Sequence, residues 1–145
     1  MGARKRLRAE AIKEARKNLA IAKLNNCPTS PRKMRLVADM VRGMPVEKAM
    51  FILRHSGKEA SNRLEKLVLS ATHNWSQKNE GENMDEAGLY VKEVYVDSAR
   101  MLKRIQPAPQ GRAHRIRKRS NHVTVILDAR NKQEEAVEEV NESNS

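Results

Sequence analysis

The sequence is short of the residues on which several protein classes depend. It has one cysteine, Cys27, so neither an intrachain disulfide nor a cysteine-based zinc cluster can form. The aromatic residues are few: Phe51, Trp75, Tyr90 and Tyr95. No apolar run approaches the roughly 20 residues of a membrane-spanning helix, and the basic N-terminus lacks the apolar core of a signal peptide. These absences argue against a disulfide scaffold and a membrane span, and they favour a soluble, intracellular protein.

The residues that commonly perform catalysis are scattered. His55, His73, His114 and His122 follow no metal-binding or nucleophile pattern, and no phosphate-cradling glycine loop occurs. An active site needs acids, bases and nucleophiles that converge on one place. We therefore predict that the chain is not an enzyme and that it requires neither a cofactor nor a metal.

Positive charge is what the sequence has in excess. Lys and Arg number 29 against 18 Asp and Glu, which gives a net charge of +11. Such a balance indicates a polyanionic partner, either nucleic acid or an anionic membrane surface. Because acids outnumber bases after Asp128, the chain before that residue is more basic than the total suggests.

The charge is densest between Arg100 and Arg119, where no Asp or Glu occurs. Strand-like sequence flanks this stretch at Leu89 to Val96 and at Val123 to Leu127, and its middle contains Pro107, Pro109 and Gly111. The pattern predicts a long β-hairpin over 97–122 with its tip at 106–113. The cations of this hairpin are Arg100, Lys103, Arg104, Arg112, Arg115, Arg117, Lys118 and Arg119.

Alternation along a strand places these cations on both faces of the hairpin. Arg115, Arg117 and Arg119 share one face of the second arm, whereas Lys118 points to the other. Neither face is apolar enough to pack on a protein core, and unpaired cations are costly to bury. Since an isolated two-stranded ribbon is marginal in water, we expect a polyanion to cover it. No aromatic residue lies in this stretch, so contact with phosphates is expected rather than base stacking.

The segment from 30 to 79 has the apolar periodicity of three helices. Ser30-Pro31 offers a favoured start for the first helix, and Gly43 ends it. Ser56 and Glu59 fit a capping box for the third helix, which runs to about Asn79. The predicted apolar faces comprise Met34, Val37, Ala38 and Val41, then Val46, Ala49, Met50 and Leu53, and finally Ala60, Leu64, Leu67, Val68, Ala71 and Trp75.

The first turn of the first predicted helix is basic, with Arg32, Lys33 and Arg35. The helix dipole disfavours cations at this end by up to about 1 kcal/mol each, whereas helix N-termini bind anions. A phosphate nearby would account for three cations here; a merely solvated basic turn is the alternative. A further strand is expected at Leu19 to Leu24, because the base of the hairpin needs a third strand.

Several segments match one family pattern in the order in which they occur. They are Ser30 to Asp39 with Arg42-Gly43, Tyr90 to Asp97, Leu102 to Arg104, Gly111 to Ala113, Ile116 to Arg119, and His122 to Val125. Together they resemble the family of large-subunit ribosomal proteins conventionally numbered twenty-two. The resemblance covers about Ala20 to Leu127.

This resemblance implies an α+β fold, in which a three-stranded antiparallel sheet is packed by three helices and carries a long protruding basic β-hairpin. It implies a structural constituent of the large subunit of the cytoplasmic ribosome that binds several rRNA domains, contacts neighbouring ribosomal proteins and supports subunit assembly. Neither a membrane span nor a homo-oligomer is expected. The rRNA-binding residues would be Arg32, Lys33, Arg35, Arg100, Lys103, Arg104, Arg112, Arg115, Arg117, Lys118 and Arg119.

The resemblance also implies that the hairpin tip lines the nascent-peptide exit tunnel and can meet the nascent peptide. The chain departs from the family pattern at Ala108 and Pro109, where a basic and a small residue are usual. The shape of the tip is therefore carried over, but a specific arginine contact is not. The tip residues are Gln106, Pro107, Ala108, Pro109, Gln110 and Gly111.

The predicted organisation has three parts. Residues 1–18 form a basic extension that orders on a partner or stays unordered, 19–128 form the rRNA-binding domain with its hairpin, and 129–145 form an acidic disordered tail. A free-standing nucleic-acid chaperone or nucleoid-type protein is the alternative function. A residual enzyme is a third possibility, for which the histidines are the candidates.

Overall fold

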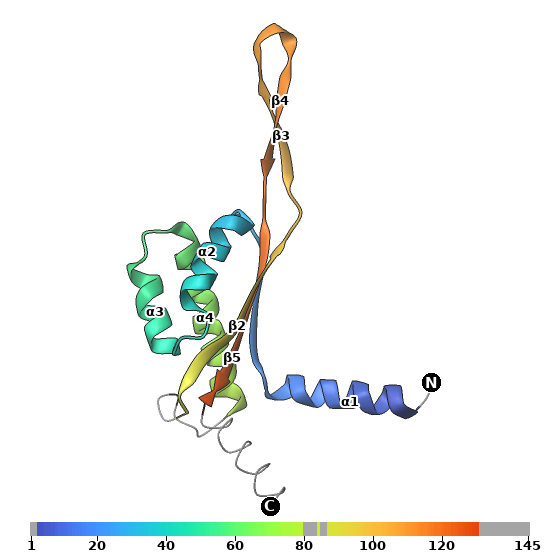
Figure 1. Ribbon diagram of the computed structural model, residues 1–145, viewed down its shortest axis with the longest axis vertical. Helices are drawn as coiled ribbons and strands as arrows, with labels where there is room; N and C mark the ends of the chain where they lie inside the picture. Colours follow the sequence, from blue (N-terminus) through green and yellow to red (C-terminus); the bar gives the residue numbers. More distant parts are fainter. Residues whose placement is uncertain (1–2, 80–83, 85–86, 131–145) are drawn as a thin grey trace, which may run out of the picture.

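The computed structural model shows a sheet covered by helices, from which a hairpin and one further helix project (Figure 1). It describes residues 3–79, 84 and 87–130. The elements are α1 (Ala3–Asn18), β1 (Ala20–Cys27), α2 (Pro31–Val41), α3 (Val46–His55), α4 (Glu59–Lys78), β2 (Leu89–Ser98), β3 (Leu102–Pro107), a 3₁₀ turn (Pro109–Gly111), β4 (Ala113–Lys118) and β5 (Asn121–Ala129).

The sheet of the body has three antiparallel strands in the order β1-β5-β2. In the central strand β5, Val123, Val125 and Leu127 are fully or almost fully buried, whereas the residues between them are only half-buried. The strand therefore has one core face, as its alternating sequence predicts. Strands β3 and β4 form a separate two-stranded sheet, the projecting hairpin. The predicted α+β fold is confirmed.

Strand β2 contains an irregularity that its sequence alone did not explain. Its apolar residues change from odd to even positions, so a regular strand would place Val91 and Val94 on opposite faces. The pairing with β5 shifts between Val91 and Glu93, which leaves Lys92 as the extra residue of a bulge. Both valines consequently lie in the core. The amino group of Lys92 donates to a carboxylate oxygen of Asp128 at 2.6 Å, across to β5.

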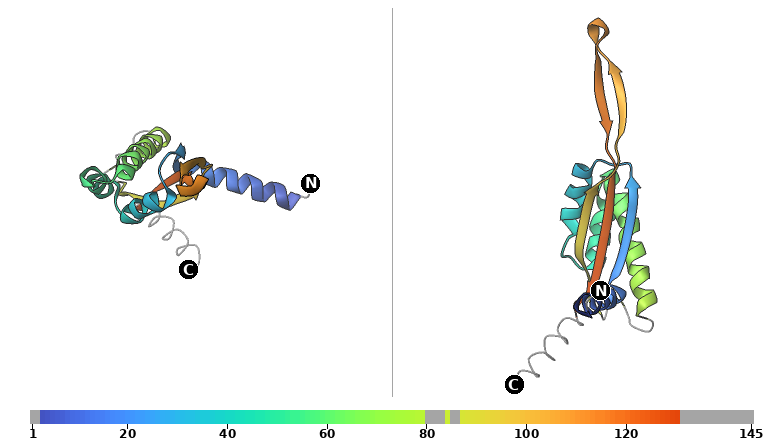
Figure 2. Two further views of the ribbon diagram at one scale, coloured as in Figure 1. Left: turned by 90° about the horizontal axis from the view of Figure 1, so that it is seen from above. Right: turned by 90° about the vertical axis from the view of Figure 1, so that its right-hand side faces the viewer.

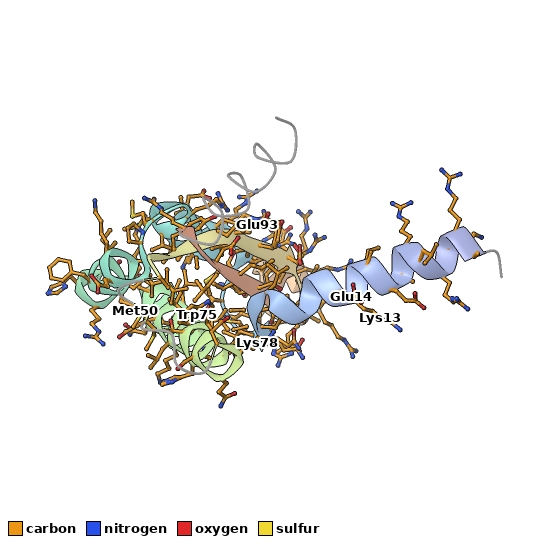
Figure 3. All side chains as sticks on the ribbon, turned by 90° about the horizontal axis from the view of Figure 1, so that it is seen from below. Lys13, Glu14, Met50, Trp75, Lys78 and Glu93 are labelled. Carbon is orange, nitrogen blue, oxygen red and sulfur yellow. The ribbon has the colours of Figure 1, made fainter. Side chains whose placement is uncertain are left out.

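Helices α2, α3 and α4 lie on one side of the sheet (Figure 2). The predicted apolar faces are confirmed, since every residue named for them is buried except Met50, which is half-buried. Trp75 belongs to the core (Figure 3). The capping box was wrong: α4 begins at Glu59 with Lys58 at the N-cap, and Ser56 instead follows the end of α3. Ser56 therefore lies two residues before the N-cap, and Glu59 is the first residue of the helix instead of the third.

Both outer edges of the sheet receive side-chain hydrogen bonds. On β2, the guanidinium groups of Arg35 and Arg42 donate to the carbonyls of Val96 and Val94, each at 3.1 Å. On the β1 side, Asn74 donates to the carbonyl of Ile21 at 3.0 Å, and Lys78 to that of Leu19 at 2.7 Å. These bonds satisfy backbone groups that an edge strand would otherwise offer to another chain. They also fix α2 and α4 along the two edges.

The structure describes most of the predicted basic extension and only the first residues of the predicted tail. Residues predicted as a basic extension form α1, which leaves the body at the start of β1 (Figure 1). Its sequence is rich in Ala, Arg, Lys and Glu, which are good helix formers. Of the tail predicted over 129–145, Ala129 ends β5 and Arg130 follows it, and the remainder lies outside the described residues.

Candidate nucleic-acid interface

The hairpin β3–β4 continues the direction of the sheet and stands clear of the helices (Figure 1, Figure 2). Its register pairs Lys103 with Arg117 and Ile105 with Arg115, so these residues share one face. The neighbouring pairs, Leu102 with Lys118 and Arg104 with Ile116, lie on the other. Cations thus occupy both faces, as the alternation predicts.

The body does not bury any part of the hairpin. No residue from Tyr95 to Ser120 is buried, and Ile105 keeps 72% of its surface exposed. Within the described part of the chain, no salt bridge joins a hairpin cation to a carboxylate. The ribbon is therefore a projecting, uncompensated positive charge, which a polyanion can neutralise and an apolar surface cannot.

The tip is built by a tight turn. Ala108 donates its backbone N–H to the carbonyl of Arg112 at 2.9 Å, which closes the loop. Gln110 and Gly111 have φ values of 62° and 71°, in the left-handed region. Glycine adopts this region freely and glutamine at some cost. Of the six predicted tip residues, Gln106 and Pro107 end β3 and pair with β4, and Ala108 to Gly111 form the turn at the far end of the hairpin.

At the base of the hairpin, two side chains of β5 fix the connection between β1 and α2. The buried Asn121 donates to the carbonyl of Thr29 at 2.6 Å. His122 accepts, at its Nδ1, the backbone N–H of Asn26 at 3.1 Å. Because the start of β5 holds this connection, the first turn of α2 lies against the root of the hairpin.

A pocket of about 500 Å³ opens at this junction, and we call it the neck pocket. It brings the first turn of α2 together with the end of β4, which lie more than eighty positions apart in the sequence. No acidic residue lines it. The lining residues are Ser30, Pro31, Arg32, Arg35, Ser98, Arg117 and Arg119.

The polar groups of the neck pocket are arranged to receive an anion. No acidic residue occupies the first turn of α2, and Ser30 makes no side-chain hydrogen bond to cap the helix. The N-terminal N–H groups therefore keep their partial positive charge. Arg32, Arg117 and Arg119 are exposed, and planar guanidinium groups match the geometry of phosphate oxygens. Four arginines therefore surround a helix N-terminus in a pocket that no acidic residue lines.

Some of the predicted rRNA-binding residues lie together in the structure, and the others do not. Arg32 and Arg35 join Arg117 and Arg119 in the neck pocket, but Lys33 does not line it. The other hairpin cations are spread along the exposed ribbon. Ser98 was missed as a lining residue, although its place at the change from apolar to cationic sequence was a usable signal.

A second basic hollow, between β1 and the start of α4, was also missed. Lys23, Arg63 and Lys66 line it, with Glu59 as the acid among its lining residues. Glu59 accepts from Arg63 at 2.9 Å, and this bond raises the pKa of the guanidinium. The sequence offered no sign of this hollow, because Lys23 meets the other two cations only through tertiary packing.

Other kinds of site are not supported by the described residues. Over 3–79, 84 and 87–130, no group of three or more His, Cys, Asp or Glu is placed to hold a metal ion. No helix in the same ranges has both the length and the apolar content needed to cross a membrane. The positive surface is the feature from which a function can be argued.

Comparison with known proteins gives a consistent result. The family described as ribosomal protein L22p/L17e matches residues 22–128. The protein named large ribosomal subunit protein uL22 of Christiangramia forsetii is 70% identical over 131 residues, which cover 90% of this chain and 97% of that protein. The protein of the same name from Flavobacterium johnsoniae is 70% identical, with 90% and 96% covered. That of Parabacteroides distasonis is 62% identical over 133 residues, with 91% and 96% covered.

Proposed function

Because the chain belongs to the ribosomal protein L22p/L17e family, we propose that it is a structural constituent of the large ribosomal subunit in the cytoplasm. It binds large-subunit rRNA through the hairpin and the neck pocket. Membership of a family of ribosomal proteins confirms the prediction that the chain is not an enzyme. The name of these relatives places them in the large subunit, and the same place is proposed for this chain.

One observation carries the proposal: the hairpin projects from the body with cations on both faces and no carboxylate partner among the described residues. A ribbon with this charge is stable when RNA encloses it, since phosphates on either side neutralise both faces. Contact with phosphates is favoured over base stacking, because the hairpin carries no Phe, Tyr or Trp.

The neck pocket supports the same function from a second location. Its arginines would clamp one phosphate group at the root of the hairpin, while the outer cations follow the RNA backbone. Contacts made at both places would set the direction in which the hairpin enters the RNA. The division of the chain into a basic extension, an rRNA-binding domain over 19–128 and an acidic tail belongs to this proposal.

The tip has a different role in the proposal. From Gln106 to Gly111 it carries no charge, whereas the arms below it are cationic. We assign it to the wall of the nascent-peptide exit tunnel, where the tip meets the nascent peptide and the arms are held by rRNA. Neighbouring ribosomal proteins would contact the body.

The experiment replaces Arg115, Arg117 and Arg119 with Ala and follows incorporation into large subunits by gradient sedimentation. Incorporation should fall strongly, whereas the thermal unfolding of the free protein should stay near that of the parent, because the three residues are exposed. The matched control replaces Lys48, Arg54 and Lys58, which lie on α3 and beyond it, outside both basic sites. Normal incorporation of the hairpin variant would overturn the proposal, as would recovery of the parent protein mainly outside ribosomal particles.

A further inference from the structure

Helix α1 is a structural feature that the proposed function does not use. Every described side chain from Ala3 to Glu14 is exposed, and the helix extends away from the body at the opposite end of β1 from the hairpin (Figure 1). At its exit, the amino group of Lys78 of α4 (labelled in Figure 3) donates to the carbonyl of Leu19. An isolated helix of this length is marginal in water, so packing against something else must stabilise it.

The chemistry of α1 excludes an apolar partner surface. Its large apolar residues, Leu7 and Ile12, are 61% and 46% exposed, and at 100° per residue they point to different sides of the helix. Protein interfaces have an apolar core from which charged residues are depleted. Helix α1 has no face that could supply such a core.

The acids of α1, in contrast, are confined to one side. Arg4, Lys5 and Arg8 fall within a sector of about 100° that contains no acid, and Glu10 and Glu14 lie on roughly the opposite side together with Arg6 and Lys13. Arg6 is 3.5 Å from Glu10 and is thereby compensated. Arg4 and Arg8, one turn apart, repel each other and weaken an isolated helix by a few tenths of a kcal/mol. An anion that bridges this cationic face would reverse that penalty.

We propose that α1 is a second RNA-binding element, which lays its Arg4–Lys5–Arg8 face on the phosphate backbone of rRNA away from the hairpin. The inference rests on the proposed function, since rRNA is the polyanion to which the rest of the chain is bound. Strand β1 separates the two elements by about 26 Å at 3.3 Å per residue, and α1 extends about a further 24 Å. The protein therefore grips the RNA at two separate places.

The test measures how salt weakens the binding of the full-length protein to deproteinised large-subunit rRNA. Each phosphate contact that is lost should reduce the slope of log K against log salt by about 0.7 to 0.9. Replacing Arg4, Lys5 and Arg8 with Gln, which keeps helix propensity nearly constant, should therefore reduce the slope by about 2. The affinity at 0.1 M salt should fall about a hundredfold.

Two further variants make the result decisive. Replacing Glu10 and Glu14 with Gln alters the same helix without removing a cation, and it should leave the affinity unchanged or raise it. The Arg115, Arg117 and Arg119 variant reports on the hairpin. If the hairpin variant loses slope and the α1 variant does not, the inference fails and the proposed function stands. If neither loses slope, the proposed function fails.

A photo-crosslinking residue at Ala9, beside the cationic face, tests the partner in intact large subunits. Crosslinks to rRNA are the expected result. Crosslinks to protein alone would show that α1 docks on an acidic protein surface, and they would overturn the inference.

Discussion

The hairpin can be removed from the body without loss of stability if its role is confined to RNA. Replacing 101–118 with Asn-Gly, a dipeptide that favours tight hairpin turns, joins β2 to β5 directly. The last backbone bond below this cut, from Ala99 N–H to the carbonyl of Ser120 at 2.9 Å, would be kept. We predict that this deletion variant folds but is not incorporated into the large subunit.

The magnitude follows from the burial. No residue in the deleted stretch is buried, so the loss of hydrophobic stabilisation is small at about 25 cal/mol per Å² of apolar area. Replacing the 18 residues of 101–118 with two shortens this stretch ninefold, which lowers the entropic cost of closing the loop by about 2 kcal/mol at most. The free energy of unfolding should therefore be unchanged or raised by up to about 2 kcal/mol. The fully buried Leu64 gives a contrast, because its replacement by Ala should cost about 2 to 5 kcal/mol.

Urea denaturation of the free proteins measures these stabilities, and gradient sedimentation measures incorporation into large subunits. The urea midpoint of the deletion variant should equal or exceed that of the parent, and the variant should be absent from ribosomal particles. A loss of stability comparable to that of Leu64→Ala would refute the reasoning, since the hairpin would then be packed on the body. Normal incorporation would show that the body alone carries the RNA contacts.

The remaining predictions concern individual bonds. Asn121→Ala should lower the free energy of unfolding by about 1 to 3 kcal/mol in urea denaturation, because the buried carbonyl of Thr29 loses its donor; an unchanged midpoint would contradict this. Gly43→Ala should cost about 1 to 2 kcal/mol by the same assay, since its φ is +77° and no neighbour would meet the added methyl group. The bond to Asp128 raises the pKa of Lys92 above its ordinary 10.5, so its stabilisation persists below that pH and is lost as pH rises through the folded-state pKa. Unfolding measured at rising pH from 8 should show a constant difference between the parent and Lys92→Gln up to about pH 10.5 and a narrowing difference above it. A difference that stays constant above that pH would rule this out.

Local chemistry explains how much of the molecule could be predicted. Apolar spacing predicted the buried faces of α2, α3 and α4, because a helix turns at a fixed angle per residue whatever it packs against. The hairpin followed from a cationic stretch with prolines and a glycine between two strand-like arms. The bulge at Lys92 could not be predicted in this way. It stabilises the fold by placing both Val91 and Val94 in the core, and that effect depends on tertiary packing.

The capping box failed for a related reason. Ser56 and Glu59 have the right spacing, but the turn between α3 and α4 is set by how the two helices pack, and it leaves Ser56 at the end of α3. Helix α1 likewise has the composition of a helix, but it has no apolar stripe to indicate which surface it packs against. The bond from Lys78 to the carbonyl of Leu19, where α1 meets β1, is a tertiary contact that the local sequence does not encode.

For the candidate site, the sequence by itself determined that the hairpin would be positive on both faces, since alternation along a strand needs no tertiary contact. It also placed Arg32 and Arg35 at the start of a helix. The tertiary structure decided that these two arginines would meet Arg117 and Arg119 in one pocket. That meeting is supported by Asn121 and His122 of β5, whose bonds to Thr29 and Asn26 hold the end of β1 and the connection to α2 at the root of the hairpin. No local pattern can encode a distance between residues so far apart, because only the packed sheet brings them together.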